Sequence, residues 1–122
     1  MADFAPFKII VKNTSIKAEY DPDTQTQWYK WAIHIESDPP NALETNVDHV
    51  VYHLHSSFPE NEIRVDKNIP KFKLASKGWG EFTINIDLFL RDNEKTTIKH
   101  YLSLSEGTST TTHFIEPNKL TQ

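Results

Sequence analysis

Residues 76–90 read SKGWGEFTINIDLFL, and this stretch decides the fold. From Phe82 onward an apolar side chain recurs at every second position, at Phe82, Ile84, Ile86, Leu88 and Leu90. A period of two predicts a strand with one buried face. Two of the chain's 3 glycines flank the tryptophan just before it, and glycine allows backbone bends and close approaches that other residues resist. The stretch therefore predicts a loop that presents Trp79 and ends directly in a rigid strand.

Alternating or β-branched runs predict further strands on both sides of this stretch. They cover Phe7–Val11 (resuming around Ile16), Tyr29–Ile35, Val47–His55, Ile63–Val65, Phe72–Leu74, Ile98–Leu104 and Thr110–Ile115. No window repeats apolar residues at helical spacing over three turns. Roughly eight short strands separated by turn residues predict an all-β fold, an immunoglobulin-like antiparallel β-sandwich, in a single domain over residues 1–122.

Composition and charge exclude some classes of function for this protein. The 122 residues include 13 basic and 17 acidic side chains, for a net charge of −4. Phosphate affinity comes from clustered Lys and Arg, so we do not expect direct nucleic-acid binding. The chain has no cysteine, no apolar run as long as a membrane span and no signal-peptide pattern at its start. We expect an intracellular, soluble protein without disulfides or membrane contact.

The six histidines raise the possibility of a metal site. His53 and His55 are two apart on a predicted strand, which would direct both to one face, and His49 is nearby. A catalytic zinc would need a third ligand, which His100 or His113 could supply only if the strands paired suitably. Histidines on a partly polar strand face are commoner than metal ligands. We therefore predict no metal and no cofactor.

Ser57 beside His55 could be a hydroxyl nucleophile with its base. However, the surrounding sequence has no strained nucleophile elbow, and no carboxylate is obviously placed to orient the imidazole. The acidic residues are scattered singly through loops, unlike the carboxylate pair of a hydrolase. We predict that the protein is not an enzyme.

The tryptophans of the second predicted strand differ in their expected roles. Trp31 shares a face with Ile33 and Ile35, which favours packing in the core. Trp28 falls on the opposite face at the start of the strand. The sequence leaves undecided whether it contributes to a pocket or to an interface.

Phe58 and Trp79 each lie on a loop that follows a predicted strand. Such loop aromatics either plug the core or contact a ligand. The hydroxyl of Ser57 and the peptide groups beside the glycines favour the ligand interpretation. Two aromatic rings with a hydroxyl and free backbone N–H groups would form a slot for a flat, neutral, hydrogen-bonding group such as an amide.

Two motifs in this order and at this separation resemble the signature of the YEATS domain. They are Val50–Pro59, which reads VVYHLHSSFP, and Gly78–Phe82, which reads GWGEF. Trp31 and Ile98–Leu104 (IKHYLSL) match the flanking pattern, so the resemblance extends from about Phe7 to Ile115. It implies an immunoglobulin-like sandwich whose end loops read acylated lysine on histone tails. It also implies a nuclear protein that is a subunit of a multiprotein chromatin-modifying, remodelling or transcription complex.

The resemblance also implies an acyl-lysine site on two facing loops. The six expected contact residues are His55, Ser57, Phe58, Gly78, Trp79 and Gly80. The Phe58 and Trp79 rings would enclose the flat acyl-amide of acetyl- or crotonyl-lysine, and the Trp79 backbone N–H would donate to the acyl carbonyl. The Ser57 hydroxyl would accept from, or bridge to, the amide N–H.

Three residues have supporting roles in this expectation. His55 would form a wall and orient the serine loop, and Phe82 would support that loop from beneath. Residues 26–30 lack the Thr-His pattern common in the family, and Trp28 is expected to replace it as a third wall. This departure leaves an alternative open, in which the sandwich is a scaffold for protein partners and binds little acyl-lysine.

Overall fold

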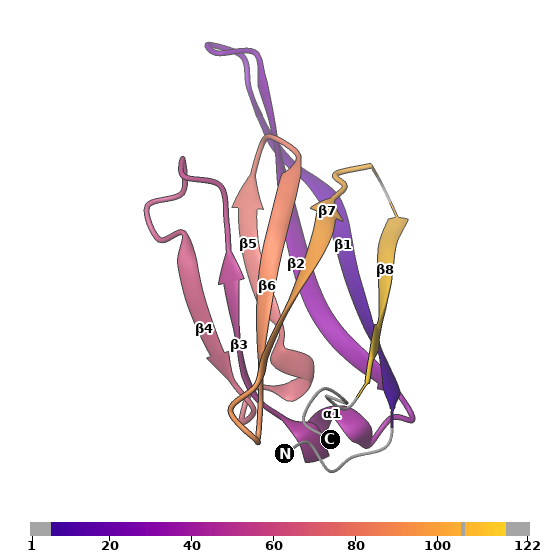
Figure 1. Ribbon diagram of the computed structural model, residues 1–122. Coiled ribbons are helices and arrows are strands. Elements are labelled where there is room, and N and C mark those ends of the chain that lie inside the picture. The colour runs from indigo at the N-terminus through magenta and orange to yellow at the C-terminus, as the bar shows by residue number, and fades with distance from the viewer. Residues whose placement is uncertain (1–5, 106, 117–122) are drawn as a thin grey trace.

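The computed structural model describes residues 6–105 and 107–116. Its strands form two four-stranded sheets, in the orders β5-β2-β1-β8 and β4-β3-β6-β7, and every strand pair is antiparallel. The sheets face one another across a common core (Figure 1). The predicted immunoglobulin-like antiparallel sandwich is confirmed.

The strands and short helices follow one another along the chain without an internal repeat. Their bounds are β1 Phe7–Asp21, β2 Thr26–Asp38, α1 Ala42–Asn46, β3 Val47–His53, β4 Glu62–Asp66, η1 Pro70–Phe72, β5 Leu74–Gly78, β6 Phe82–Leu90, β7 Lys95–Leu102 and β8 Gly107–Ile115.

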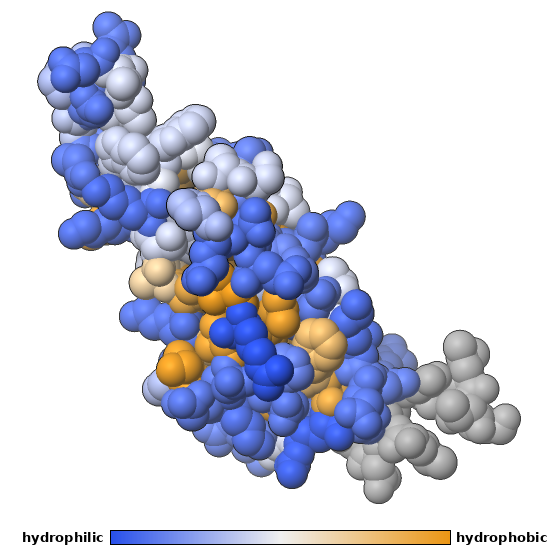
Figure 2. Space-filling view, turned by 90° about the vertical axis from the view of Figure 1, so that its left-hand side faces the viewer, coloured by the Kyte–Doolittle hydropathy of each residue, from blue (hydrophilic) through white to orange (hydrophobic). Residues whose placement is uncertain are grey.

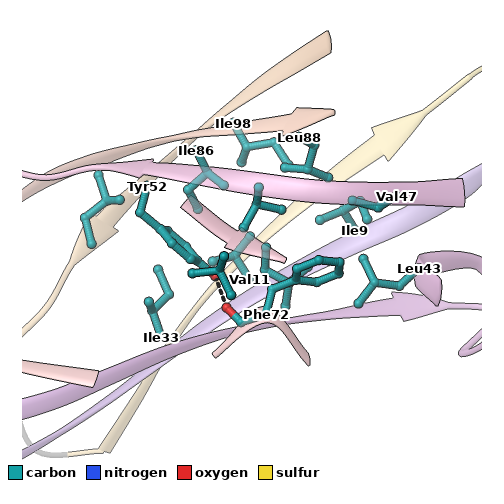
Figure 3. Close-up of a cluster of buried hydrophobic side chains, with 14 of the residues drawn as sticks. Ile9, Val11, Ile33, Leu43, Val47, Tyr52, Phe72, Ile86, Leu88 and Ile98 are labelled. Carbon is teal, nitrogen blue, oxygen red and sulfur yellow. Dashed lines mark hydrogen bonds between the residues drawn. The ribbon is translucent and has the colours of Figure 1, made fainter. Parts of the chain in front are cut away.

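The core forms where the apolar sides of the two sheets meet (Figure 3). Alternate residues of β6 are buried and their neighbours are not, as the sequence period predicts. Trp31, Ile33 and Ile35 are all buried on one face of β2, so the predicted core role of Trp31 is confirmed. Burial of these apolar side chains supplies most of the driving force for the fold.

The segment around Phe72 corrects one strand prediction. Phe72 belongs to the 3₁₀ turn η1, and β5 begins only at Leu74. Lys71 and Phe72 have φ angles of 55° and 51°, which extended strands do not adopt. Phe72 is nevertheless buried, because the turn directs its ring into the core.

A short helix, α1, occupies the connection that we expected to be irregular. Its 5 residues are too few to show helical spacing in the sequence. Ala42 and Leu43 are buried, and the Ser37 hydroxyl accepts a hydrogen bond from the Leu43 N–H at 2.9 Å. In the described part of the chain no helix has the length and apolar character needed to cross a membrane.

The first strand is longer than predicted and forms a hairpin with β2. β1 runs from Phe7 to Asp21 with a register shift between Lys17 and Tyr20, whereas we expected a strand over Phe7–Val11 that resumes around Ile16. The partner β8 pairs with β1 only as far as Ser15, so the rest of the hairpin projects beyond the sandwich (Figure 1). The loops that follow β3 and β5 lie at this same end of the molecule.

A buried histidine joins the two sheets near this end. His100 of β7 is fully buried, with Nε2 2.7 Å from Oδ1 of Asn13 and Nδ1 2.7 Å from Oγ1 of Thr111. Asn13 donates through Nδ2 to the Ser103 carbonyl at 3.0 Å, which leaves its Oδ1 as the acceptor. Asn13 Oδ1 therefore accepts from the Nε2–H of His100, and in the neutral ring, which burial favours, Nδ1 accepts from the Thr111 hydroxyl.

Because of His100, we expect the folded protein to lose stability in mild acid. Desolvation by burial lowers the pKa of His100 from its ordinary value of 6.5. The unfolded chain therefore takes up the proton first, so the stabilisation is complete above 6.5 and is lost as the pH falls below that value. The slope that one proton contributes cannot exceed about 1.4 kcal/mol per pH unit. Urea unfolding at pH 7.5, 6.5 and 5.5 measures it.

The control for this prediction is His100→Gln, whose amide keeps a donor and an acceptor but does not titrate. The two proteins differ only at this position, so the contributions of all other groups cancel in the comparison. We expect the wild type to lose more stability between pH 7.5 and pH 5.5 than the variant. Equal losses would show that the His100 site does not resist protonation.

A second prediction concerns Tyr52, whose phenol donates a 2.6 Å hydrogen bond to the Phe72 carbonyl (Figure 3). Tyr52 is fully buried, and burial raises the pKa of its phenol. Tyr52→Phe leaves the buried carbonyl without this donor, so we expect a loss of about 1–3 kcal/mol in the free energy of unfolding. Tyr101→Phe is the matched control, because Tyr101 is 55% exposed. Equal losses for the two variants would contradict the prediction.

Candidate functional site

A pocket of about 380 Å³ lies at the hairpin end of the sandwich, between the loop after β3 and the loop after β5. All eight residues named from the sequence line it. They are Trp28, His55, Ser57, Phe58, Gly78, Trp79, Gly80 and Phe82. The structure thus brings together side chains from three separate parts of the chain. It adds Pro59, Lys77 and Glu81, which we did not predict.

The loop after β3 is held in shape by its own backbone. β3 ends at His53, two residues earlier than predicted, and the Leu54 N–H then donates to the Asn61 carbonyl at 2.7 Å. Within the loop, the Phe58 N–H donates to the His55 carbonyl at 3.0 Å. These bonds close residues 54–61 into a compact turn that presents its side chains at the end of the sandwich.

His55 and Ser57 form a local pair on this loop. The Ser57 N–H donates to His55 Nδ1 at 3.1 Å, and the Ser57 hydroxyl lies 2.9 Å from the same nitrogen. Because Nδ1 accepts from the backbone, it carries no proton, and the hydroxyl must also donate to it. The lone pairs of the Ser57 oxygen are then left to accept a hydrogen bond from another group.

Phe58 and Phe82 form the aromatic floor of the pocket, and Trp31 of the other sheet packs against both rings. Phe58 packs against Phe82 at a ring-centroid distance of 5.4 Å and against Trp31 at 6.4 Å. His55 also lies over Phe82, at 6.1 Å. Phe82 is thus in contact with two residues of the serine loop.

Trp79 is the exposed wall of the pocket. Its side chain is 62% exposed, whereas Phe58 is partly buried against the core. Trp79 is therefore not a core plug. A ligand that enters the pocket could cover the Trp79 ring, and this burial of apolar surface would contribute to binding.

Gly78 and Gly80 were both expected to lie in the loop that presents Trp79. Gly78 is the last residue of β5, paired with Tyr29, so the loop begins at Trp79 and not at Gly78. Neither Gly78 nor Gly80 has a φ in the left-handed region. A Cβ on Gly80 would meet no atom within 4 Å. These two glycines therefore keep space open and do not relieve backbone strain.

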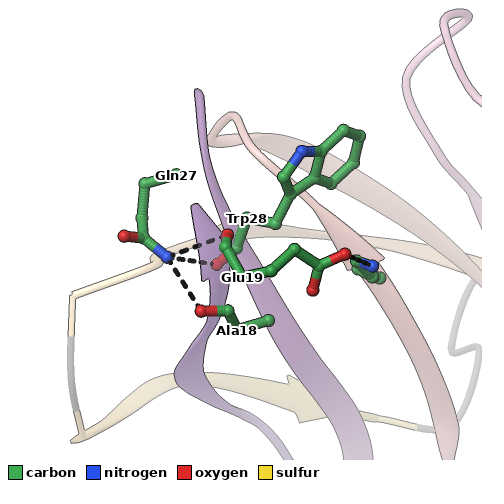
Figure 4. Close-up of polar contacts among 5 residues, drawn as sticks. Ala18, Glu19, Gln27 and Trp28 are labelled. Atoms are coloured by element: carbon green, nitrogen blue, oxygen red, sulfur yellow. Dashed lines mark hydrogen bonds and ion pairs between the residues drawn. The ribbon is translucent and has the colours of Figure 1, made fainter. Parts of the chain in front are cut away.

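Trp28 reaches the pocket from the base of the projecting hairpin. The Gln27 side-chain amide donates to the carbonyls of Ala18, Glu19 and Trp28 at 3.2, 3.2 and 2.9 Å (Figure 4). Ala18 and Glu19 lie at the register shift of β1, so this amide holds the irregular backbone in place.

Lys77 connects the hairpin to β5. Its ammonium pairs with Glu19 and lies 5.4 Å from the centroid of the Trp28 ring. The bond from Lys77 lowers the pKa of the exposed Glu19 carboxyl. The contact steadies the orientation of Trp28, which is among the residues that line the pocket.

Glu81 ties the Trp79 loop to the end of β7. Its carboxylate accepts from the Tyr101 hydroxyl at 3.0 Å and from the Leu104 N–H at 2.7 Å. This role of Glu81 was not predicted from the sequence, although Glu81 stands between Gly80 and Phe82 in the second motif. The sequence does not reveal the hydrogen-bond partner of Glu81, because Leu104 lies 23 residues further along the chain.

The histidines considered as metal ligands lie in different surroundings. His53 is 2.8 Å from Asp87 and 3.5 Å from Glu62 on β6 and β4, whereas His55 faces Ser57 in the pocket. His100 is enclosed between the sheets. Across residues 6–105 and 107–116, no group of three His, Cys, Asp or Glu side chains is placed to hold a metal ion.

The surface beside the pocket is partly apolar. Figure 2 looks onto the side of the molecule that carries β4 and shows apolar groups in its middle, surrounded by hydrophilic ones. Partly buried apolar side chains packed against the core include Ile63 of β4 and Leu74 of β5.

Comparison with known proteins gives consistent matches. A sequence model of the YEATS family matches residues 26–106. "Protein AF-9 homolog" of Kluyveromyces lactis is 36% identical over 77 residues, covering 61% of this chain and 34% of that protein. "Transcription initiation factor TFIID subunit 14b" of Arabidopsis thaliana is 31% identical over 84 residues, covering 66% and 31%. The chain thus spans about a third of the length of these relatives.

Solved structures match over nearly the whole chain. "The Yaf9 YEATS domain Recognizing H3K122suc Peptide" has a TM-score of 0.75 and 26% identity, covering 94% of this chain and 88% of that one. "Crystal structure of the Yaf9 YEATS domain bound to H3K27ac" matches with the same values.

Proposed function

The chain belongs to the YEATS family, and from this premise we propose that it reads acetylated or crotonylated lysine on histone tails. The site is the pocket between residues 54–61 and residues 79–81. The similar Yaf9 domains are described with acylated H3 peptides, which supports a histone ligand. The observation that carries the proposal is the convergence of all eight expected residues on one pocket.

In the proposed complex the acyl-amide lies between the Phe58 and Trp79 rings. The Trp79 backbone N–H donates to the acyl carbonyl, and the Ser57 oxygen accepts from the amide N–H. The direction of the Ser57–His55 bond supports this role, because the hydroxyl proton is already donated to Nδ1. His55 orients the serine, while Gly78 and Gly80 leave room for the ligand.

Discrimination against unmodified lysine follows from charge. An ammonium ion loses its hydration on entering an aromatic slot and cannot accept from a backbone N–H. The Glu81 carboxylate in the lining already accepts two hydrogen bonds, from Tyr101 and Leu104. Acylation removes the charge and adds a carbonyl acceptor. A flat crotonyl group also adds stacking area.

The cellular setting is proposed by analogy with the relatives. One of them is named as a TFIID subunit, which supports membership of a multiprotein transcription or chromatin complex. Such a complex places the protein in the nucleus. A single small pocket binds weakly, so we expect other modules of the complex to add avidity.

The test is a titration of H3 peptides that carry acetyl-lysine, crotonyl-lysine or unmodified lysine at the same position. We expect saturable binding of the two acylated peptides and at least about tenfold weaker binding of the unmodified one, on the scale of one lost hydrogen bond. Equal affinity for all three would contradict the proposal and favour a scaffold role. Mass spectrometry of the recovered peptides also checks whether the Ser57–His55 pair cleaves the acyl group.

A further inference from the structure

A second hollow, the outer groove, lies on the outer face of the β5-β2-β1-β8 sheet and has a volume of about 490 Å³. Ser15 and Trp31 are buried on the core side of this sheet, so their neighbours along β1 and β2 face outward. The outward-facing residues that line the groove are Thr14, Ile16, Lys30, Ala32, Ala75 and Lys77.

The strand register explains why the sheet is hollow here. Ala32 lies opposite Thr14 of β1 and opposite Ala75 of β5, so three short side chains form one row across the sheet. The rows on either side carry longer side chains, which are Ile16, Lys30 and Lys77 in one row and Lys12 and His34 in the other. A row of short side chains between two rows of long ones leaves a groove with a largely apolar floor.

The outer groove adjoins the proposed acyl-lysine pocket. Lys77 lines both hollows, and its ammonium lies over Trp28, another residue of the pocket. Along β5 the groove includes Ala75 and the pocket includes Gly78. These two residues are roughly 10 Å apart, at about 3.3 Å per residue of strand. A ligand in the pocket therefore has the groove within reach on the same face of the protein.

We propose that the outer groove binds an apolar side chain of the acylated peptide. The inference rests on the proposed function, and it adds a second recognised feature to the ligand besides its acyl group. An extended peptide covers roughly 10 Å in about three residues, and the acyl-lysine side chain adds further reach. The apolar residue should therefore stand about three to five positions from the acyl-lysine.

The composition of the groove favours an apolar side chain over a basic one. Ile16 is 62% exposed at its edge, and Ala75 is exposed on its floor. A leucine or isoleucine would bury apolar surface against both residues. A basic side chain would lose hydration against this floor and would be repelled by Lys30 and Lys77 on the wall.

The test is a leucine scan of one acylated peptide. The host peptide carries acetyl-lysine between runs of glycine and serine, and a single leucine replaces each flanking residue in turn. We expect leucine at one or two positions, about three to five residues from the acetyl-lysine, to tighten binding about three- to tenfold, on the scale of partly burying one apolar side chain. Lysine at the same position should give no gain. No gain from leucine at any of these positions would overturn the inference.

Two variants outside the pocket link this gain to the groove. Ala75→Gln fills the groove with a long polar side chain, and Ile16→Ser removes its apolar edge. Both positions are exposed, so the sandwich should stay folded. We expect each variant to abolish the leucine gain, while the leucine-free peptide binds as tightly as to the wild type. A gain that survives in Ala75→Gln would contradict the inference.

Thr112→Gln is the matched control for these variants. Thr112 is exposed on β8, where it pairs with Ile10, and it is not among the residues that line the groove. We expect this variant to keep the full leucine gain. Loss of the gain in Thr112→Gln would show that the effect does not come from the groove.

The same titrations separate this inference from the proposed function. If no acylated peptide binds, the proposed function fails, and the outer groove loses its ligand with it. If the leucine-free acylated peptide binds but leucine adds no affinity, only the groove assignment fails. If sedimentation shows that the wild type is a dimer and Ile16→Ser a monomer, the groove is an interface between two copies of this chain, and the inference is wrong.

Discussion

Trp79→Ala is expected to weaken acetyl- and crotonyl-lysine binding by about thirtyfold or more, on the scale of truncating a central aromatic contact. The reason is that Trp79 forms the exposed wall of the pocket, with 62% of its surface available to cover the acyl-amide. The free energy of unfolding should change by no more than about 0.5 kcal/mol, as for other exposed positions. Peptide titration and urea unfolding of the same preparation measure both effects.

The matched control is Trp79→Phe, which keeps an aromatic ring and the backbone N–H. We expect it to bind within a few-fold of the wild type, since a stacking ring remains. If Trp79→Ala unfolds the protein, the ring supports the core and is not a ligand contact. If it folds and binds normally, the pocket does not use this ring.

Ser57→Ala is expected to weaken binding by about ten- to a hundredfold, because the amide N–H of the ligand would be buried without an acceptor. The side chain is exposed and its partner His55 lies on the same loop, so the sandwich should stay folded. The measurement is the same titration with acetyl- and crotonyl-lysine peptides. Wild-type affinity in this variant would remove Ser57 from the binding site.

Substitutions of His55 separate its orienting role from direct contact. The imidazole Nδ1 accepts from both the N–H and the hydroxyl of Ser57. In His55→Asn the side-chain oxygen can take the place of Nδ1, so we expect binding within about threefold of the wild type, less than the value of one hydrogen bond. His55→Leu has no acceptor and should approach the loss seen in Ser57→Ala. Equal effects of the two His55 variants would contradict the orienting role.

Much of the fold could be predicted because its signals are local. The alternation from Phe82 to Leu90 specifies one buried face, and the same holds for Trp31, Ile33 and Ile35. Phe72 was predicted wrongly because two neighbouring residues have left-handed φ values, which side-chain type does not indicate for Lys and Phe. Helix α1 was missed because 5 residues cannot show a helical period.

Eight of the residues that line the pocket were named from the sequence, but the internal geometry of the site was not predicted. Gly78 was expected to lie in the loop and to leave the Trp79 peptide accessible, whereas it ends β5, where a Cβ would contact Phe58 at 3.5 Å and Trp31 at 3.7 Å. Lys77 and Glu81 were missed because their partners, Glu19 and Leu104, are distant in the chain. Contacts of this kind depend on strand register, which single residues do not encode.

The stretch SKGWGEFTINIDLFL thus determines by itself a presented tryptophan and a rigid strand with one buried face, since periodicity and residue type act over a few neighbours. Only the tertiary structure decided what stands opposite Trp79 and what lies beside its pocket. The packing of two sheets brought Phe58, Ser57 and Trp28 to the same pocket, and strand pairing aligned Ala32 with Ala75 in the outer groove. These relations arise from long-range packing, so a reading of the sequence alone could not supply them.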